Sequence, residues 1–348
     1  MQNFLKIFGA ILSPITSSKS FADNPLLGSP KLNRLGLHTA RKRAAHMMCQ
    51  VRRIIMAPKV TKAWRDDYQR QGFVRIQNFL PEKIFKEVKH ELAKLAQQSI
   101  EMRQGSTITR RFNLDASNCR NLPSLQSILR HRELLWGLRY IAGYWGQPII
   151  AVQCIHAEKD DSCQSRDPQT DWHLDTFHST AKAWIFMHEV KTDEGPFAYV
   201  PGSHRPSKHR LAWEKEQSIY AAKHANRLHA RGSFRVCPED IQHLGYGQPM
   251  IGAVAENTLI VADTSGFHRR TPSPKNTVRV EIYMSLRRNP FWAGLYPSLL
   301  GLPYIKNHWA SLAWGLYRWM DKIGRHSWQA STEEGLTAKE LSKLDVPE

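Results

Sequence analysis

Short apolar runs bounded by turn-forming residues dominate the middle of the chain. Such runs predict buried strands of a β-rich domain rather than long helices. The four clearest runs cover 148–155, 183–190, 258–262 and 277–286. Their spacing along the chain indicates a single β-rich unit rather than a repeat.

Two apolar stripes at helical spacing precede these strands. The first follows Pro81 and covers 84–95, and the second covers 125–141 and ends at Gly143. Helices with one apolar face would cover the outer face of the larger of two sheets. The predicted fold is therefore mainly β with flanking helices, a double-stranded β-helix of the cupin-like jelly-roll type backed by helices.

Composition divides the 348 residues into four segments. We expect a basic amphipathic arm at 1–60, a jelly-roll domain at 61–290, an aromatic helical extension at 291–330 and a polar, mobile tail at 331–348. No uninterrupted apolar run has the length of a membrane-spanning helix.

Five cysteines that form no Cys-x-x-Cys pair favour a reducing compartment, so we expect a cytoplasmic protein.

Positive charge is concentrated in the arm. The chain has 49 basic and 31 acidic residues, a formal net charge of +18, and ten of the basic residues lie in 1–60 beside the single acid Asp23. Such an arm suits a targeting segment, peripheral contact with an anionic membrane, or a helix packed on the barrel. Nothing resembles a nucleic-acid-binding module, so no nucleic acid partner is expected.

The extension at 291–330 interleaves aromatic and basic residues. Trp309, Leu312, Leu316 and Trp319 recur at helical spacing. A helix of this kind can pack on the barrel, roof a site inside it, or lie at a membrane interface, where tryptophan and basic side chains suit the head-group region. Packing on the barrel is the favoured interpretation.

A His-x-Asp triplet and a distant histidine carry the candidate chemistry. His173 and Asp175 are two residues apart, so on an extended backbone both side chains point to one face. His268 follows the predicted strand at 258–262. Two histidines and one carboxylate form the facial triad of non-haem Fe(II) oxygenases, which leaves positions open for a co-substrate and O2.

Other histidines have simpler interpretations. With 16 histidines in the chain, a His-x-Asp triplet also arises by chance, so the surroundings of each candidate decide its weight. His156 and Glu158 offer a rival pair, but they lead from a predicted strand into a polar loop. His204 follows Pro201 and Gly202 and is expected to hold a turn rather than a metal.

Arg279 lies in the predicted strand at 277–286 between two valines. If 2-oxoglutarate binds iron through its 1-carboxylate and keto oxygen, its 5-carboxylate is left buried, where an unpaired charge is costly. The planar guanidinium of an arginine holds such a carboxylate through two hydrogen bonds. The alternative is a surface arginine paired with Glu281, which shares its face of the strand.

The stretch 183–204 resembles the corresponding part of the phytanoyl-CoA dioxygenase family, whose members are Fe(II)- and 2-oxoglutarate-dependent oxygenases. Weaker similarity extends from about Tyr68 to about Arg287. The resemblance implies that His173, Asp175 and His268 hold Fe(II), that Arg279 binds 2-oxoglutarate, and that Trp184 lines the co-substrate pocket.

The chain departs from the family at one position. Members often carry a serine two residues after the distal histidine, where its hydroxyl helps to bind the 5-carboxylate, but this chain has Arg270 there. Thr271, one position later, is the candidate replacement if a bulge shifts the register.

The resemblance implies hydroxylation of an aliphatic carbon of a small or acyl, lipid-like substrate, with consumption of O2 and 2-oxoglutarate and release of succinate and CO2. Asp175 argues against halogenation, because related halogenases lack that carboxylate. Two other functions stay open. Arg279 argues against a jelly-roll iron dioxygenase that does not use 2-oxoglutarate, and the intact ligand set argues against a non-catalytic basic lipid-binding protein.

Overall fold

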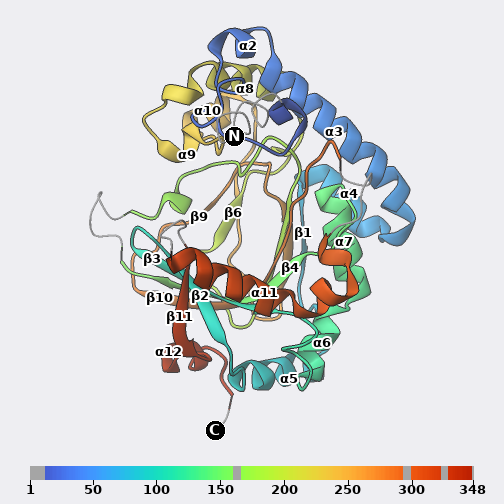
Figure 1. Cartoon of the computed structure of the whole chain (residues 1–348), viewed down its shortest axis with the longest axis vertical. Coiled ribbons are helices and arrows are strands. Elements are labelled where there is room, and N and C mark those ends of the chain that lie inside the picture. Colours follow the sequence, from blue (N-terminus) through green and yellow to red (C-terminus); the bar gives the residue numbers. More distant parts are fainter. Residues whose placement is uncertain (1–11, 160–165, 293–298, 323–327, 347–348) are drawn as a thin grey trace.

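Two antiparallel sheets form the centre of the molecule (Figure 1). The computed structural model describes residues 12–159, 166–292, 299–322 and 328–346. The larger sheet has eight strands in the order β1-β8-β5-β10-β4-β3-β2-β11, and the smaller has three in the order β7-β6-β9. Side chains from both sheets line one cavity between them. The predicted jelly roll, a β-rich fold backed by helices, is confirmed.

The strands are β1 (Phe73–Ile76), β2 (Gln98–Gln104), β3 (Thr107–Leu114), β4 (Ile149–Ala157), β5 (Ala181–Phe186), β6 (Phe197–Tyr199), β7 (Met250–Ile251), β8 (Leu259–Asp263), β9 (His268–Arg270), β10 (Thr277–Leu286) and β11 (Gln329–Glu334). The four predicted strands correspond to β4, β5, β8 and β10.

Strand β10 separates the apolar core from the cavity. It pairs with β4 on one side and with β5 on the other, so it lies near the middle of the large sheet. Val280 and Ile282 point into the core beneath the helices, whereas Arg279 and Glu281 line the cavity between the sheets. This two-residue alternation places charged groups inside the barrel without interrupting the core on the other face.

The α-helices of the described residues are α2 (Pro30–Arg34), α3 (Leu37–Met56), α4 (Lys62–Gln71), α5 (Glu82–Ala93), α6 (Pro123–Leu129), α7 (Arg132–Ala142), α8 (Lys208–Tyr220), α9 (Arg227–Ala230), α10 (Pro238–His243), α11 (Pro303–Lys322) and α12 (Ala338–Leu341). Single 3-10 turns are η1 (Ser13–Ile15), η2 (Ala57–Lys59), η3 (Pro168–Thr170), η4 (Ala221–Lys223) and η5 (Leu299–Gly301).

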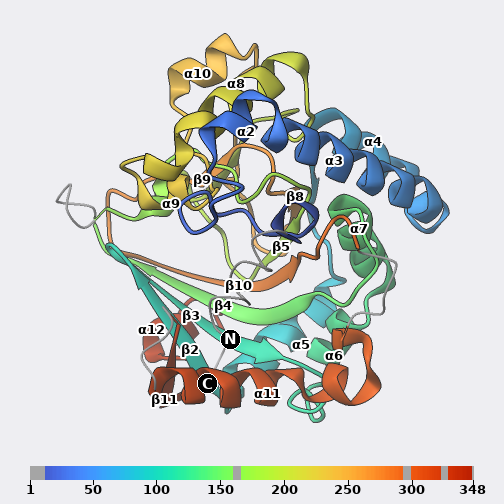
Figure 2. The same cartoon turned by 45° about the horizontal axis from the view of Figure 1, so that its top comes forward.

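Helices α3 to α7 pack against the core side of the large sheet (Figure 2). The prediction of one continuous helix over 125–141 is wrong, because the chain breaks after α6 and restarts at α7. The ring of His131 accepts a hydrogen bond from the backbone N–H of Leu134 and so caps the second helix. Gly143 ends α7 with φ 78°, as predicted for a residue that must adopt the left-handed conformation.

Helix α3, in the basic arm, turns four of its five lysine and arginine side chains inward, and only Arg43 is exposed. Arg41, Lys42, Arg52 and Arg53 are buried, whereas several of its aliphatic residues face outward. The guanidinium of Arg41 donates to backbone carbonyls of residues 13–18, and that of Arg53 donates to the carbonyls of residues 140 and 141. The arm is therefore packed into the fold, and these charges are not available to a membrane surface.

The C-terminal tail is ordered, so the expectation of a mobile segment is wrong for the residues that the structure describes there. Strand β11 extends the large sheet by pairing with β2, and Leu344 is fully buried. Glu340 in α12 forms ion pairs with Arg110 at 2.6 Å and with His156 at 2.7 Å. These contacts fasten the tail to β3 and β4.

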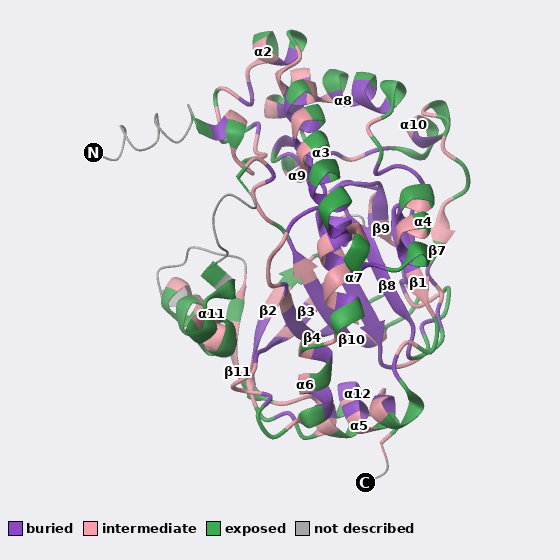
Figure 3. Ribbon diagram, turned by 90° about the vertical axis from the view of Figure 1, so that its right-hand side faces the viewer, coloured by how far each residue is buried: buried purple, intermediate pink, exposed green. Residues whose placement is uncertain are grey.

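Helix α11 lies apart from the buried strands and carries much exposed surface (Figure 3). Leu312, Leu316 and Trp319 are exposed, whereas Ala310 and Ala313 are buried. Tyr296 and Arg325, which belong to the predicted aromatic extension, lie outside the described residues. Among the described residues, no helix is long and apolar enough to cross a membrane.

Candidate metal centre and its cavity

Two segments far apart in the sequence bring the three candidate ligands together. His173 and Asp175 lie in the connection between η3 and β5, and His268 is the first residue of β9. The backbone N–H of His173 donates to the carbonyl of His268 at 3.0 Å, and the reverse bond is 2.9 Å long. The backbone N–H of Asp175 donates to Thr264 at 2.9 Å. An isolated β-bridge, rather than a regular strand, therefore fixes the His-x-Asp segment against β9.

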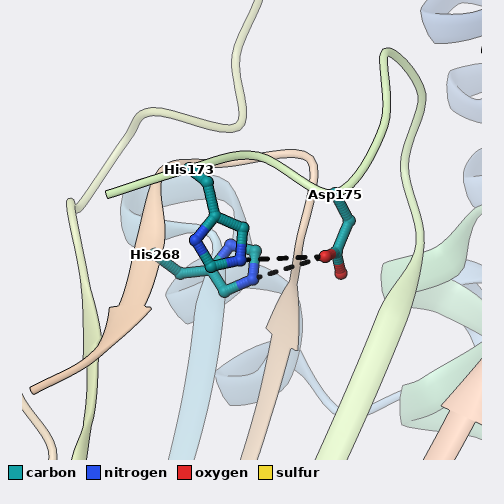
Figure 4. Close-up of side chains that lie close together, drawn as sticks. All are labelled: His173, Asp175 and His268. Carbon is teal, nitrogen blue, oxygen red and sulfur yellow. Dashed lines mark ion pairs between the residues drawn. The ribbon is translucent and has the colours of Figure 1, made fainter. Parts of the chain in front are cut away.

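The three side chains converge on one point (Figure 4). One potential ligand atom from each residue lies within 4.8 Å of the others. Oδ1 of Asp175 is 4.0 Å from Nε2 of His173 and 3.8 Å from Nε2 of His268. Three donors at these separations, on one side of a common centre, can hold a single metal ion facially.

Hydrogen bonds orient both imidazoles toward that centre. Nδ1 of His173 donates to the carbonyl of Asp171 at 2.7 Å, and Nδ1 of His268 donates to the carbonyl of Gly266 at 3.0 Å. A proton on Nδ1 leaves the lone pair on Nε2, the tautomer that a metal requires. Both Nε2 atoms are buried and lack a hydrogen-bond partner among the described residues. Buried polar atoms are normally satisfied, so this pair fits a metal ion.

Burial and the charges around the centre favour the protonation states in which the two histidines and Asp175 can bind a metal ion. Burial and then the neighbouring His268 and Arg235 hold the pKa of His173 well below its usual range. Burial also lowers the pKa of His268. Burial opposes ionisation of Asp175, but Lys182 and the two histidines together hold its pKa well below the usual range. Neutral imidazoles beside an ionised carboxylate are the forms that coordinate a cation.

Asp175 has two lysine neighbours. The Lys182 ammonium lies 2.6 Å from Oδ2, on the side away from the histidines' contact with Oδ1. Lys19, from the arm, donates to the backbone carbonyl of Asp175 at 2.5 Å. The arm thus supports the loop that carries one of the candidate ligands.

The centre opens into a cavity of about 230 Å³ between the two sheets. Arg279 lines it and is 8% exposed; its Nη1 donates to the carbonyl of Gly195 at 2.7 Å, and its Nε lies 2.9 Å from Oε2 of Glu281. The predicted pairing with Glu281 therefore exists, but inside the barrel rather than on an exposed face. Trp184 and Phe197 supply apolar walls, with ring centroids 4.7 Å apart.

Arg270 lies in the cavity wall, whereas the neighbouring Thr271 lies outside it. Arg270 lines the cavity, and its Nη1 donates to Asp167 at 2.6 Å. Burial, followed by the charge of Arg279, lowers the pKa of Arg270 against the opposing effect of Asp167. The Thr271 hydroxyl instead donates to the carbonyl of Pro196 at 3.1 Å, and Thr271 is not among the residues that line the cavity.

The two rival histidines lie away from the centre. His156 is bound to Glu340, and His204 packs against Tyr68 with ring centroids 5.0 Å apart. Neither belongs to the one group of potential metal ligands found among the described residues.

Sequence reasoning missed several polar residues of the cavity, among them Lys182, Gln153 and Arg111. For Lys182 a signal existed, because it precedes Trp184 by two residues and so shares its face of β5. Gln153 and Arg111 lie opposite each other on β4 and β3, and this pairing is visible only in the folded sheet.

Residues 68–239 match the family model described as Phytanoyl-CoA dioxygenase (PhyH). The resemblance read from the sequence is thus confirmed over these residues. The matched region contains His173, Asp175 and Trp184, whereas His268 and Arg279 lie beyond its end. The fold, rather than the family match, brings His268 to the other two candidate ligands.

Solved structures with a similar chain course include three other proteins. The epimerase SnoN, in complex with Fe3+, alpha ketoglutarate and nogalamycin RO, has 15% identity and a TM-score of 0.43, covering 63% of this chain and 80% of its own. The carbocyclase SnoK from nogalamycin biosynthesis has 18% identity and a TM-score of 0.39, with 66% and 84% covered. HygX from Streptomyces hygroscopicus, with nickel and 2-oxoglutarate bound, has 16% identity and a TM-score of 0.39, with 65% and 86% covered. No curated protein matches the chain. Similarity of this size leaves the function to be argued from the residues of the cavity.

Proposed function

We propose that the chain is an Fe(II)- and 2-oxoglutarate-dependent dioxygenase that hydroxylates an aliphatic carbon of a small substrate. The observation that carries this proposal is the pair of unpartnered, buried Nε2 atoms beside the Asp175 carboxylate. An Fe(II) ion would be held by His173, Asp175 and His268. When bound, iron and 2-oxoglutarate supply the oxidising power: O2 and 2-oxoglutarate become succinate and CO2, and one oxygen atom enters a C–H bond of the substrate.

The residues of the cavity orient the co-substrate and exclude water. Arg279 retains guanidinium N–H groups beyond those committed to Gly195 and Glu281, so it can donate to the 5-carboxylate of 2-oxoglutarate. Arg270 adds a second cation next to it, at the position where relatives often have serine. Thr271 stays a weaker candidate for this role, because its hydroxyl would have to leave Pro196 first. Trp184 would form the apolar wall of the same pocket.

A jelly-roll iron dioxygenase without 2-oxoglutarate is the alternative. Arg279 and Arg270 line one cavity, and each keeps guanidinium N–H groups beyond those that face its carboxylate partner, which favours a carboxylate-bearing co-substrate.

The direct test is O2-dependent formation of succinate by the purified protein supplied with Fe(II) and 2-oxoglutarate. We expect slow turnover without the true substrate, loss of turnover without O2 or iron, and loss in the Asp175→Ala variant. Succinate formation that persists in this variant would contradict the assignment of the metal centre.

We propose a cytoplasmic location, where 2-oxoglutarate is available and iron stays reduced. We further propose that the protein contacts anionic membranes peripherally and acts on an acyl, lipid-like substrate. The support is the exposed face of α11, which presents Leu312, Leu316 and Trp319 beside Arg318. Since four of the five lysine and arginine side chains of α3 are buried, this contact would resist salt, in contrast to the electrostatic attraction that the composition suggested.

Sedimentation with anionic vesicles tests the membrane contact. Trp319→Ser should weaken binding at both low and high salt, whereas Tyr220→Ser, which removes an exposed aromatic side chain on α8, should not. Equal binding by the two variants would contradict the proposed membrane contact of α11.

A further inference from the structure

Arg111 is a cation in the cavity that forms no ion pair with an acidic side chain of the described residues. Its Nε donates to Oε1 of Gln153 at 2.7 Å, and Gln153 in turn donates to the buried carboxylate of Glu281. No carboxylate of the described residues forms an ion pair with Arg111. The terminal nitrogens of its guanidinium are therefore left for another acceptor.

Two aromatic rings hold this guanidinium in place. Its central carbon lies 4.2 Å from the ring centroid of Tyr283, in β10, and 4.7 Å from that of Trp328, which follows α11. Stacking on aromatic rings together with the Gln153 bond at Nε fixes the plane of the guanidinium, which leaves its outer edge as a prepared donor. The C-terminal extension thus contacts a cavity residue through Trp328.

The net charge of the cavity lining also favours an anionic ligand. Five basic residues line it, against two acidic ones: Arg111, Lys182, Arg269, Arg270 and Arg279, with Asp175 and Glu281. A bound Fe(II) ion and a 2-oxoglutarate dianion would cancel each other, so the lining would stay cationic after both had bound. Lys182 is close enough to Arg111 for their charges to interact, and it lies on the same cavity wall.

We propose that the substrate carries an oxyanion group, a carboxylate or a phosphate, that is held by Arg111. This inference rests on the proposed function, because it assigns Arg279 to the co-substrate and Arg111 to the substrate. In the large sheet Arg111 lies on β3, separated from β10 by β4, so the two arginines enter the cavity from different strands. The planar edge of a guanidinium recognises either oxyanion through paired hydrogen bonds.

Three probes of equal chain length test the inference: octanoate, octyl phosphate and octanol. Each is titrated calorimetrically, without O2, into protein that is saturated with Fe(II) and 2-oxoglutarate, so that Arg279 is already occupied. We expect octanoate or octyl phosphate to bind at least about tenfold more tightly than octanol, since a charge-assisted hydrogen bond contributes that much. The better of the two anions identifies the group.

Variants assign the preference to a residue. Arg111→Gln should remove the preference for the anion, and Arg111→Lys should keep part of it. Arg103→Gln is the matched control, because it deletes the same charge from an exposed position on the neighbouring strand β2. Circular dichroism shows whether each variant folds, and the comparison of probes in the unaltered protein needs no variant at all.

The outcomes separate this inference from the proposed function. Equal affinities for the three probes, including no binding by any of them, overturn the role of Arg111, and so does an anion preference that survives in Arg111→Gln. If the protein binds Fe(II) and 2-oxoglutarate but shows no preference, only the substrate assignment fails. If it binds the anionic probes through Arg111 but never binds 2-oxoglutarate, the proposed function fails instead.

Discussion

The metal cavity and the seam between α3 and α8 both bury several charges, but they satisfy them differently. In the seam, Glu214 is fully buried and contacts three partners: Lys42 at 2.7 Å, His38 at 2.8 Å and Arg210 at 2.7 Å. In the cavity, the Nε2 atoms of His173 and His268 have no hydrogen-bond partner among the described residues. Compensated charges hold a fold together, whereas uncompensated ones are prepared for a ligand.

This contrast corrects an inference from composition. The count of basic residues drew attention to the arm as a possible binding surface, yet the structure uses many of those residues as internal partners of carbonyls and of Glu214. The cavity has fewer charges and several of them are paired, but the Nε2 atoms of His173 and His268 make no hydrogen bond to the described residues. We therefore expect changes in the cavity to affect binding and turnover, and changes in the seam to affect stability.

The largest effect is expected at the metal ligands. His173→Ala, Asp175→Ala and His268→Ala should each weaken Fe(II) binding by at least about 100-fold, because even residues that only support metal ligands contribute up to that factor. Calorimetric titration of Fe(II) without O2 measures the change, and His209→Ala, at an exposed histidine of α8, is the control. A ligand variant that binds iron as the unaltered protein does would contradict the site, provided that its thermal unfolding is unchanged.

The matching change in the seam is Glu214→Ala. It leaves Lys42 and Arg210 buried without their counter-charge, which should lower the free energy of unfolding by about 3–5 kcal/mol. Urea unfolding measures the loss, and Glu216→Ala, on the exposed side of the same helix, should change it by less than about 0.5 kcal/mol. Iron affinity in the folded fraction should stay the same. Loss of iron binding with unchanged stability would reverse the roles given to the two regions.

Arg279→Ala should weaken 2-oxoglutarate binding by about 2–5 kcal/mol, the usual effect of removing one partner of a buried charge pair. Arg279→Lys should recover part of that loss, because it restores the charge but not the paired donors. Titration of 2-oxoglutarate into the iron-loaded variants measures both. Unchanged affinity in the alanine variant would favour the iron dioxygenase that does not use 2-oxoglutarate.

The smallest expected effect concerns the pH dependence of the C-terminal tail. Burial opposes ionisation of Glu340, but hydrogen bonds from His156 and Thr337 and the charge of Arg110 lower its pKa to about 2 from 4.5. A lowered carboxyl pKa stabilises the fold above about pH 4.5, and that stability is lost as the pH falls toward about 2. Unfolding free energies at about pH 5 and pH 3 should therefore differ by about 1–2 kcal/mol more in the unaltered protein than in Glu340→Gln. Equal pH dependence in both would show that Glu340 does not fasten the tail.

Much of the fold could be predicted because the core strands are apolar on the face that the helices cover. Strands β2 and β3 escaped prediction for a physical reason: the face of β3 that lines the cavity carries Thr109 and Arg111, so no continuous apolar run exists. The break between α6 and α7 depends on a single cap by His131, which spacing does not reveal.

The candidate ligands could be predicted because His173 and Asp175 are close in sequence and recur in a known family pattern. The polar residues that surround them in the cavity could not be predicted. Lys182 meets Asp175, and Gln153 meets Arg111, only after strands distant in sequence pair in the large sheet. The burial that leaves the histidines unpartnered is likewise a property of the folded chain.

The most direct test of the account is the dependence of 2-oxoglutarate binding on Fe(II). If the cavity holds both, with iron at His173, Asp175 and His268 and the 5-carboxylate at Arg279, each ligand must strengthen the binding of the other by the same factor. We predict that calorimetric titration without O2 finds one 2-oxoglutarate per chain, bound at least about tenfold more tightly with Fe(II) than without it. Equal affinity with and without the metal would contradict a shared site and, with it, the proposed function.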